Sequence, residues 1–289
     1  MAMSANTGNP PHQAAGDADA ARVGLRAWQM LALAAAGYLL LSLLGGRPGH
    51  PLMLPRPLAL AVVITAGVAF IGISVVLVAL TSRLSLSWQR QLALAGGFGA
   101  AFGAARLGHV AAVGDLLLVI GATFMGALAS RVVRERNMLV PVAVAAAAVD
   151  TWGVYWGFVA KVAEKAPQVV AQFSAAVPVA ALVEVPLLKS IGVGDFLFMG
   201  LFVAAVYRMH LNVRATLWAL FAVFLVVPVV FSIAGVPALP GLPFLGLAVL
   251  AANWRHFRFS RAEKFALLYA TLAVAALIGA AWAVKQALT

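Results

Sequence analysis

Long uninterrupted runs of apolar residues are the feature that most limits what this chain can fold into. Of its 289 residues, 64% are hydrophobic and only 10% are charged, whereas soluble domains average about 25% charged residues. A run of about 20 apolar residues is long enough to cross the hydrocarbon layer of a membrane as a helix. The chain is therefore predicted to be an all-α polytopic membrane protein with about nine spanning helices. They are expected over 27–44, 57–81, 91–106, 109–130, 138–162, 188–208, 213–234, 236–252 and 262–285.

The basic residues give the predicted topology. The formal net charge is +11, but Lys and Arg lie mostly in the short gaps between apolar runs, which indicates a lipid bilayer as partner and no nucleic acid. With the amino terminus placed inside, the inner segments hold thirteen Lys and Arg and the outer segments seven. This bias predicts a cytoplasmic amino terminus and an outer carboxyl terminus. The Ala-, Gly- and Arg-rich composition favours a prokaryotic cytoplasmic (inner) membrane.

Four regions follow from this pattern. Residues 1–26 are predicted to be a disordered cytoplasmic tail, 27–137 the amino-terminal transmembrane helices, 138–252 a candidate catalytic membrane region, and 253–289 a loop and a carboxyl-terminal transmembrane helix. The span expected over 91–106 is short and glycine-rich, and the orientation of every later span depends on it.

Two irregular features accompany these spans. Gly99 and Gly103 of the third span form a small-xxx-small pair, which indicates close helix packing. The connection 163–187 contains three prolines and is therefore not an undisturbed helix. We expect a re-entrant or surface segment there, with extended stretches over Val169–Phe173 and Val177–Val183.

Three aspartates, Asp115, Asp150 and Asp195, fall within predicted spans. A charge at the centre of a bilayer costs about 2.5–3.5 kcal/mol on insertion scales, so such residues are functional candidates. Gly192 and Gly194 precede Asp195 and leave room for another chain beside its carboxylate. Two facing aspartates on consecutive helices would share one proton and could activate water for peptide hydrolysis. Asp115 lies a few residues inside its span and is interpreted as interfacial.

A proline-rich stretch forms a third element near the start of the span 236–252. Pro237, Ala238 and Leu239 are followed by Pro240 and Pro243. Such a stretch leaves backbone carbonyls free and can line a site for an extended peptide. Taken alone, it is more simply interpreted as a plain helix entry with proline in the first turn.

These elements together resemble the presenilin and signal peptide peptidase family of intramembrane aspartyl proteases. The matching motifs are Asp150, then Gly192-Val193-Gly194-Asp195, then Pro237-Ala238-Leu239, in the family's order. The resemblance covers roughly residues 145–250. It implies that Asp150 and Asp195 are the catalytic pair, that Gly192, Gly194 and Pro237–Leu239 shape the substrate site, and that the substrate is a transmembrane peptide or protein.

The sequence also departs from the family pattern. Val149 stands where the family has tyrosine. Four spans are counted before Asp150, where the family has five, and one extra span follows Leu239. The charge bias places the connection after Asp150 outside, which is similar to signal peptide peptidases and opposite to presenilins.

Other interpretations remain open. A transporter could use Asp115, Asp150 and Asp195 as a proton or cation path through broken helices, and a degenerate homologue could bind membrane helices without cleaving them. A prepilin-type peptidase would normally have lysine after its Gly-x-Gly-Asp aspartate, whereas Phe196 follows here. Without cysteine or a His-Glu-x-x-His motif, no metal site and no cofactor are expected.

Overall fold

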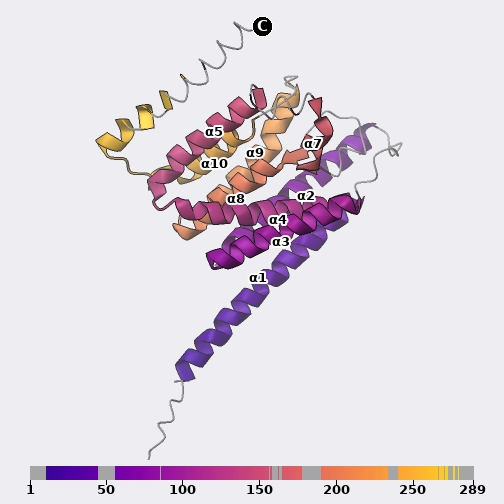
Figure 1. The fold of residues 1–289 in the computed structure, drawn as a ribbon, viewed down its shortest axis with the longest axis horizontal. Helices are drawn as coiled ribbons and strands as arrows, with labels where there is room; N and C mark the ends of the chain where they lie inside the picture. The colour runs from indigo at the N-terminus through magenta and orange to yellow at the C-terminus, as the bar shows by residue number, and fades with distance from the viewer. Residues whose placement is uncertain are drawn as a thin grey trace, which may run out of the picture.

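The computed structural model of the protein is a bundle of α-helices with one short two-stranded sheet (Figure 1). The structure describes residues 11–44, 56–84, 86–155, 157, 162, 165–177, 190–233, 240–265, 267–269, 271–272, 276 and 279.

The long helices confirm the prediction of an α-helical membrane protein in its general form. Among the described residues, five helical segments are long and apolar enough to cross a membrane. The number nine is not confirmed, because three of the other expected spans are shorter or less apolar helices and the described residues cover the last one, 262–285, only in part. The five segments are Leu25–Leu43, Ile64–Arg83, Ala111–Val132, Arg136–Tyr155 and Val213–Val230.

The amino-terminal helix α1 (Pro11–Leu44) begins earlier than expected. The stretch 1–26 was predicted to be a disordered tail, yet helix starts within it at Pro11. Proline is favoured in the first turn of a helix and alanine, which is frequent here, has the highest helix propensity. Further along, α1 packs against α2 (Arg56–Arg83), where the buried rings of Tyr38 and Phe70 lie 5.0 Å apart.

The third predicted span is a helix, α3 (Trp88–Leu107), which a short turn joins to α4 (Ala111–Ala129). The prediction that Gly99 and Gly103 mark close helix packing is wrong. A Cβ added at either position would meet nothing within 4 Å. The close approach comes from α4 instead, where a Cβ at Gly121 would lie 3.1 Å from the Cβ of Phe98.

The centre of the bundle is the crossing of α4 with α8 (Val193–Arg208) (Figure 1). Between Phe196 and Val206, helix α8 is apolar on all sides, which is the pattern of a fully buried helix, and Phe196, Met199 and Phe202 are completely enclosed. The two backbones touch through glycine. A Cβ at Gly126 would lie 1.9 Å from the carbonyl oxygen of Leu197, and one at Gly200 would lie 2.6 Å from that of Thr123.

Three further helices stand on one side of this crossing, as Figure 1 shows: α5 (Leu139–Tyr155), α9 (Val213–Ile233) and α10 (Leu242–Asn253). Helix α10 packs against both α5 and α9. Its 12 residues span about 18 Å, and the 16 residues of α8 about 24 Å. Both helices are therefore shorter than the roughly 30 Å hydrocarbon layer.

The segment between α5 and α8 is partly helical and partly extended. The expectation of an extended stretch over Val169–Phe173 is wrong, because α7 (Pro167–Gln172) is a helix with proline at its start. Extended backbone follows in β1 (Ser174–Ala176), which pairs antiparallel with β2 (Ser190–Gly192), Ala175 opposite Ile191. Of the second expected stretch, Val177–Val183, only Val177 lies within the described residues.

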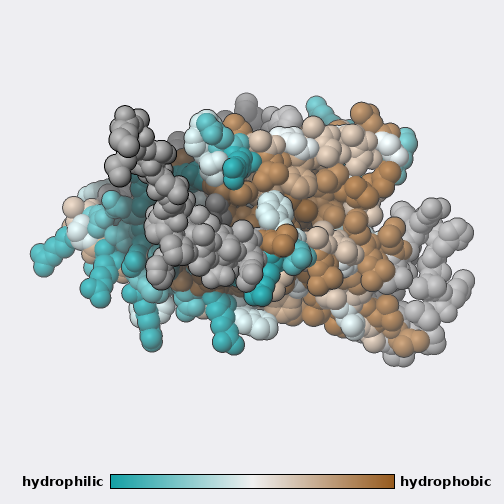
Figure 2. All heavy atoms as spheres, turned by 90° about the horizontal axis from the view of Figure 1, so that it is seen from below, coloured by the Kyte–Doolittle hydropathy of each residue, from teal (hydrophilic) through white to brown (hydrophobic). Residues whose placement is uncertain are grey.

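The surface separates into two zones. Figure 2 shows hydrophilic side chains gathered at one end of the visible face and hydrophobic side chains over most of the rest. The connection from α4 to α5, the end of α8 and the segment after α10 supply exposed arginines, including Arg134, Arg136, Arg208 and Arg255. We call this the basic end.

Candidate carboxylate site

Asp150 lies near the end of α5 and contacts the start of α10. Its Oδ2 atom accepts a hydrogen bond of 2.9 Å from the backbone N–H of Leu242, and the N–H of Gly241 donates to the same carboxylate. These are the first N–H groups of α10, which have no partner inside the helix. The partial positive charge of a helix amino terminus also favours a carboxylate at this place.

Asp195 lies in the first turn of α8, which begins only at Val193 and not at 188 as expected. Gly192 is the capping residue of that helix, and its backbone N–H donates to the Asp195 carboxylate. A side chain that reaches back to the cap in this way is half of a capping box. The aspartate is thus fixed at the point where strand β2 changes into helix α8.

The two aspartates meet at Gly241. A Cβ at Gly241 would lie only 2.5 Å from Oδ1 of Asp195, so the Asp195 carboxyl group rests against the glycine whose N–H donates to Asp150. The two carboxyl groups are close enough for direct electrostatic repulsion. Both are partly buried, and the ion pair recorded among the described residues involves neither of them.

The other residues of the sequence-predicted site are placed unequally. Gly192 adjoins Asp195, with 3.5 Å between an added Cβ and Oδ2. A Cβ at Gly194 would meet nothing within 4 Å, so open space lies beside it. Pro237, Ala238 and Leu239 lie outside the described residues. Val149, at the family's tyrosine position, is 67% exposed on the surface of α5.

Sequence reasoning missed Gly241 and Leu242, although they provide the contacts that join the two aspartates. The available signal was a glycine between two prolines, Pro240 and Pro243, just after the Pro-Ala-Leu motif. Glycine at that point allows close approach of another group, and the following proline indicates a helix start.

Asp115 is separate from this pair. It lies near the start of α4, as expected, and is buried at 6% exposure. Its Oδ1 atom accepts a 2.6 Å bond from Arg106, and its Oδ2 atom accepts a 3.1 Å bond from the N–H of Ala176 in β1. Arg106 also donates to the carbonyls of Gln172 and Ser174. The Arg106–Asp115 pair therefore covers the edge of β1 that faces away from β2.

The described residues contain no group of three or more His, Cys, Asp or Glu side chains that could hold a metal ion. No family model, no curated protein and no solved structure matches the chain. The helices define an α-helical membrane protein. Its distinctive site is a pair of neighbouring aspartates held by the starts of two short helices.

Proposed function

We propose that this protein is an intramembrane aspartyl protease that hydrolyses peptide bonds in or near transmembrane segments. The observation that carries the proposal is the meeting of Asp150 and Asp195 at Gly241. Residues 45 positions apart in sequence, on two different helices, are brought to one glycine at the start of a third.

The depth of the pair supports this proposal. Asp195 precedes Arg208, at the end of α8, by 13 residues, which is about 20 Å of helix. If the basic end lies at one membrane surface, Asp195 is about two thirds of the way through a hydrocarbon layer of about 30 Å. Carboxyl groups at that depth are costly and belong as a rule to functional sites.

The chemistry needs no metal and no covalent intermediate. Two carboxyl groups so close together are both ionised only at an electrostatic cost, so the pair shares one proton. The ionised carboxylate takes a proton from the attacking water, and the protonated carboxyl group donates to the carbonyl oxygen of the scissile peptide bond.

The two-stranded sheet offers a way to present the substrate. A transmembrane helix must unwind before cleavage, and its freed backbone groups then need new partners. The outer edge of β1 is occupied by the Arg106–Asp115 pair. The outer edge of β2 ends at Gly192, whose N–H points to Asp195. A substrate strand added along β2 would therefore run to the aspartate pair.

The same proposal includes the family and the setting. It places the chain with the presenilin and signal peptide peptidase type of protease in a prokaryotic inner membrane, with a cytoplasmic amino terminus. Val149 in place of tyrosine is compatible with it, because this side chain is exposed on the outside of α5. A group at that position contributes to lipid or substrate contact rather than to the carboxylate pair.

The test is cleavage of a model transmembrane substrate by the purified protein. Asp150→Asn is preferred to an alanine variant, because the remaining side-chain oxygen can still accept from Gly241 and Leu242 while the ionisable group is lost. Asp195→Asn is its counterpart. The matched control is Glu263→Gln, a substitution of the same kind at a half-buried position in the segment after α10.

We expect cleavage to fall at least about 1,000-fold in each Asn variant and to stay unchanged in the control, since the acid–base pair acts as a unit. Equal cleavage by the parent and both Asn variants would identify a contaminant and remove the proposal. A parent that cleaves no substrate but dissipates a proton gradient, and loses this ability in the Asn variants, would instead support the transporter.

A further inference from the structure

A second polar feature lies at the other end of α5, α8 and α10 from the aspartate pair. There the connection from α4 to α5, the end of α8 and the segment after α10 surround an open hollow of about 880 Å³. We call it the basic hollow. It is lined by Arg134, Glu135, Arg136, Asn137, Arg208, Met209, His210, Arg255, His256 and Arg258.

The charge around the hollow is unbalanced. Five arginines and two histidines line it, against the single carboxylate of Glu135. The ion pair recorded among the described residues is Arg106–Asp115, far away in the fold, so no carboxylate there is paired with these arginines. Guanidinium groups gathered in this way repel one another, and an anion between them removes the repulsion.

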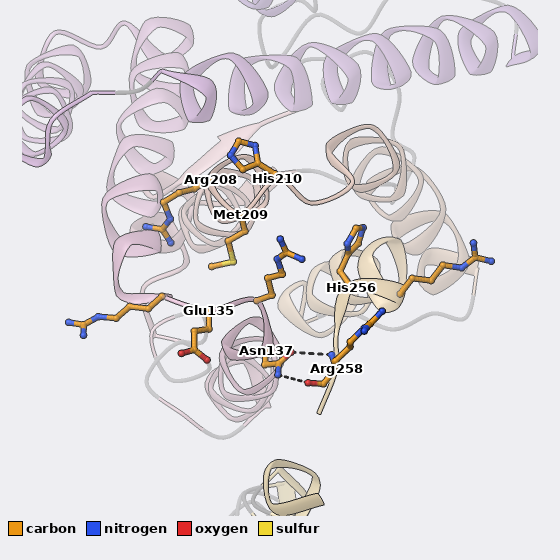
Figure 3. A pocket seen from close by; sticks show the side chains of 10 residues that line it. Glu135, Asn137, Arg208, Met209, His210, His256 and Arg258 are labelled. Carbon is orange, nitrogen blue, oxygen red and sulfur yellow. Dashed lines mark hydrogen bonds between the residues drawn. The ribbon is translucent and has the colours of Figure 1, made fainter. Parts of the chain in front are cut away.

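The walls of the hollow are fixed by hydrogen bonds. The side chain of Asn137 donates to the carbonyl of Arg258 (2.8 Å) and accepts from its N–H (3.3 Å), as the dashed lines in Figure 3 show. Arg208 donates to the carbonyls of Ser130 and Val133. The three segments are thus tied together. Figure 3 shows Arg208 and His210 on one side of the space and His256 on the other.

The position of the hollow indicates the kind of anion. The apolar segment Ala111–Val132 ends beside it and the segment Arg136–Tyr155 begins there. The hollow is therefore at the level where hydrocarbon gives way to headgroups and water. Lipid phosphates lie at this level, and arginine matches a phosphate with two parallel hydrogen bonds.

We propose that the basic hollow is a binding site for a phosphate-bearing anion, supplied by the headgroup of an anionic phospholipid. Basic pockets between membrane helices on the cationic side of a protein are suited to such headgroups. The site is separate from the aspartate pair, and its occupation can be measured without any cleavage.

The experiment measures binding to the delipidated full chain in a non-ionic detergent. Phosphatidylglycerol, diphosphatidylglycerol, phosphatidylcholine and soluble pyrophosphate are titrated separately, with the thermal midpoint and native mass spectrometry as readouts. The variant is Arg255→Gln/Arg258→Gln. The control is Arg214→Gln, an exposed arginine in the first turn of the neighbouring helix α9 that does not line the hollow.

We expect the apparent Kd for both anionic lipids to rise about fivefold for each arginine removed, hence about 25-fold in the double variant, and less than twofold in the control. Phosphatidylcholine should produce no comparable stabilisation. Pyrophosphate that stabilises the parent alone and displaces the lipid would show that the same site takes a soluble phosphate. Equal weakening by Arg214→Gln, or no preference for anionic lipid together with no response to pyrophosphate, would overturn the proposal.

A second variant covers the case in which the double Gln protein does not fold. Arg255→Lys/Arg258→Lys keeps both charges but lacks the planar fork that pairs with two phosphate oxygens. It should bind anionic lipid at least about threefold more weakly than the parent. If this folded variant and the parent bind the lipids and pyrophosphate alike, the hollow does not recognise phosphate.

Discussion

Replacing Gly241 by alanine should damage the carboxylate pair while leaving the fold intact. The new Cβ would lie 2.5 Å from Oδ1 and 3.2 Å from Cγ of Asp195, whereas real Cβ contacts are essentially never shorter than 3.0 Å. The obstructing atoms are the end of a short side chain, so the carboxyl group can rotate aside by about 0.5 Å or more. An off-rotamer side chain of this kind costs about 0.5–1.5 kcal/mol.

The loss of activity should be much larger than the loss of stability. A misplacement of about 1 Å in a catalytic group can reduce a rate about 100-fold, so we expect a 10- to 100-fold decrease in substrate cleavage. The thermal midpoint of the purified protein should change by only a few degrees. Gly99→Ala is the control, because its Cβ would meet nothing within 4 Å.

A double variant separates this explanation from a general defect at the start of α10. If the clash with Asp195 causes the stability loss in Gly241→Ala, the loss should disappear when Asp195 is also replaced by alanine. Additive stability losses in the two single variants would contradict the contact. Full activity and an unchanged thermal midpoint in Gly241→Ala would refute the reasoning as well.

Three further predictions concern stability. Gly200→Ala should lower the free energy of unfolding by about 3 kcal/mol, because the new Cβ would lie 2.6 Å from the Thr123 carbonyl oxygen and backbone cannot rotate aside. The thermal midpoint should fall accordingly. A midpoint equal to that of the parent would contradict the close crossing of α4 and α8. Asp115→Asn should lower the free energy of unfolding, measured by heat or denaturant, by about 3 kcal/mol. This is the lower end of the cost of breaking a buried ion pair, because the Arg106 side chain is 22% exposed. A decrease below about 0.5 kcal/mol would show that the Arg106–Asp115 pair does not hold β1 in place. Hydrogen bonds from the backbone N–H and the hydroxyl of Ser260 lower the pKa of Glu263, so the stability that this carboxylate contributes is present above the ordinary value of 4.5 and is lost as the pH falls through the lowered pKa. The thermal midpoint of Glu263→Gln should therefore lack this acid-dependent decrease. Identical pH profiles of the thermal midpoint in the parent and the variant would disprove it.

The apolar runs predicted the helical part of the fold well because hydropathy is a local property. Five expected spans contain helices of the required length and apolarity. The pattern failed where helices are short. Residues before Val193 and before Leu242 are still largely apolar, so hydropathy alone does not mark where these helices begin. The beginnings depend on Gly192 and Gly241, whose roles are set by contacts with distant segments.

The candidate site was predictable in its two aspartates but not in its supports. Asp150 and Asp195 were evident as acids inside apolar runs. Gly241 is one glycine among 26, and only the packing of α10 against α5 and α8 brings it to both carboxyl groups. The partners of Asp115 were not predictable for a similar reason, because Arg106 and Ala176 come together only through the packing of α3, α4 and β1.

The short helices themselves explain how two carboxyl groups can lie inside an apolar bundle without a basic partner among the described residues. A helix that crosses the whole bilayer has its unpaired N–H groups in water, where they cannot help a buried acid. Helices α8 and α10 are shorter than the layer, so in the placement that we propose their first N–H groups and positive dipole ends would lie at membrane depth. Gly192 donates to Asp195, and Gly241 and Leu242 donate to Asp150. A lysine or arginine at this position would neutralise the carboxylates, whereas backbone N–H groups stabilise them and leave their proton free to move.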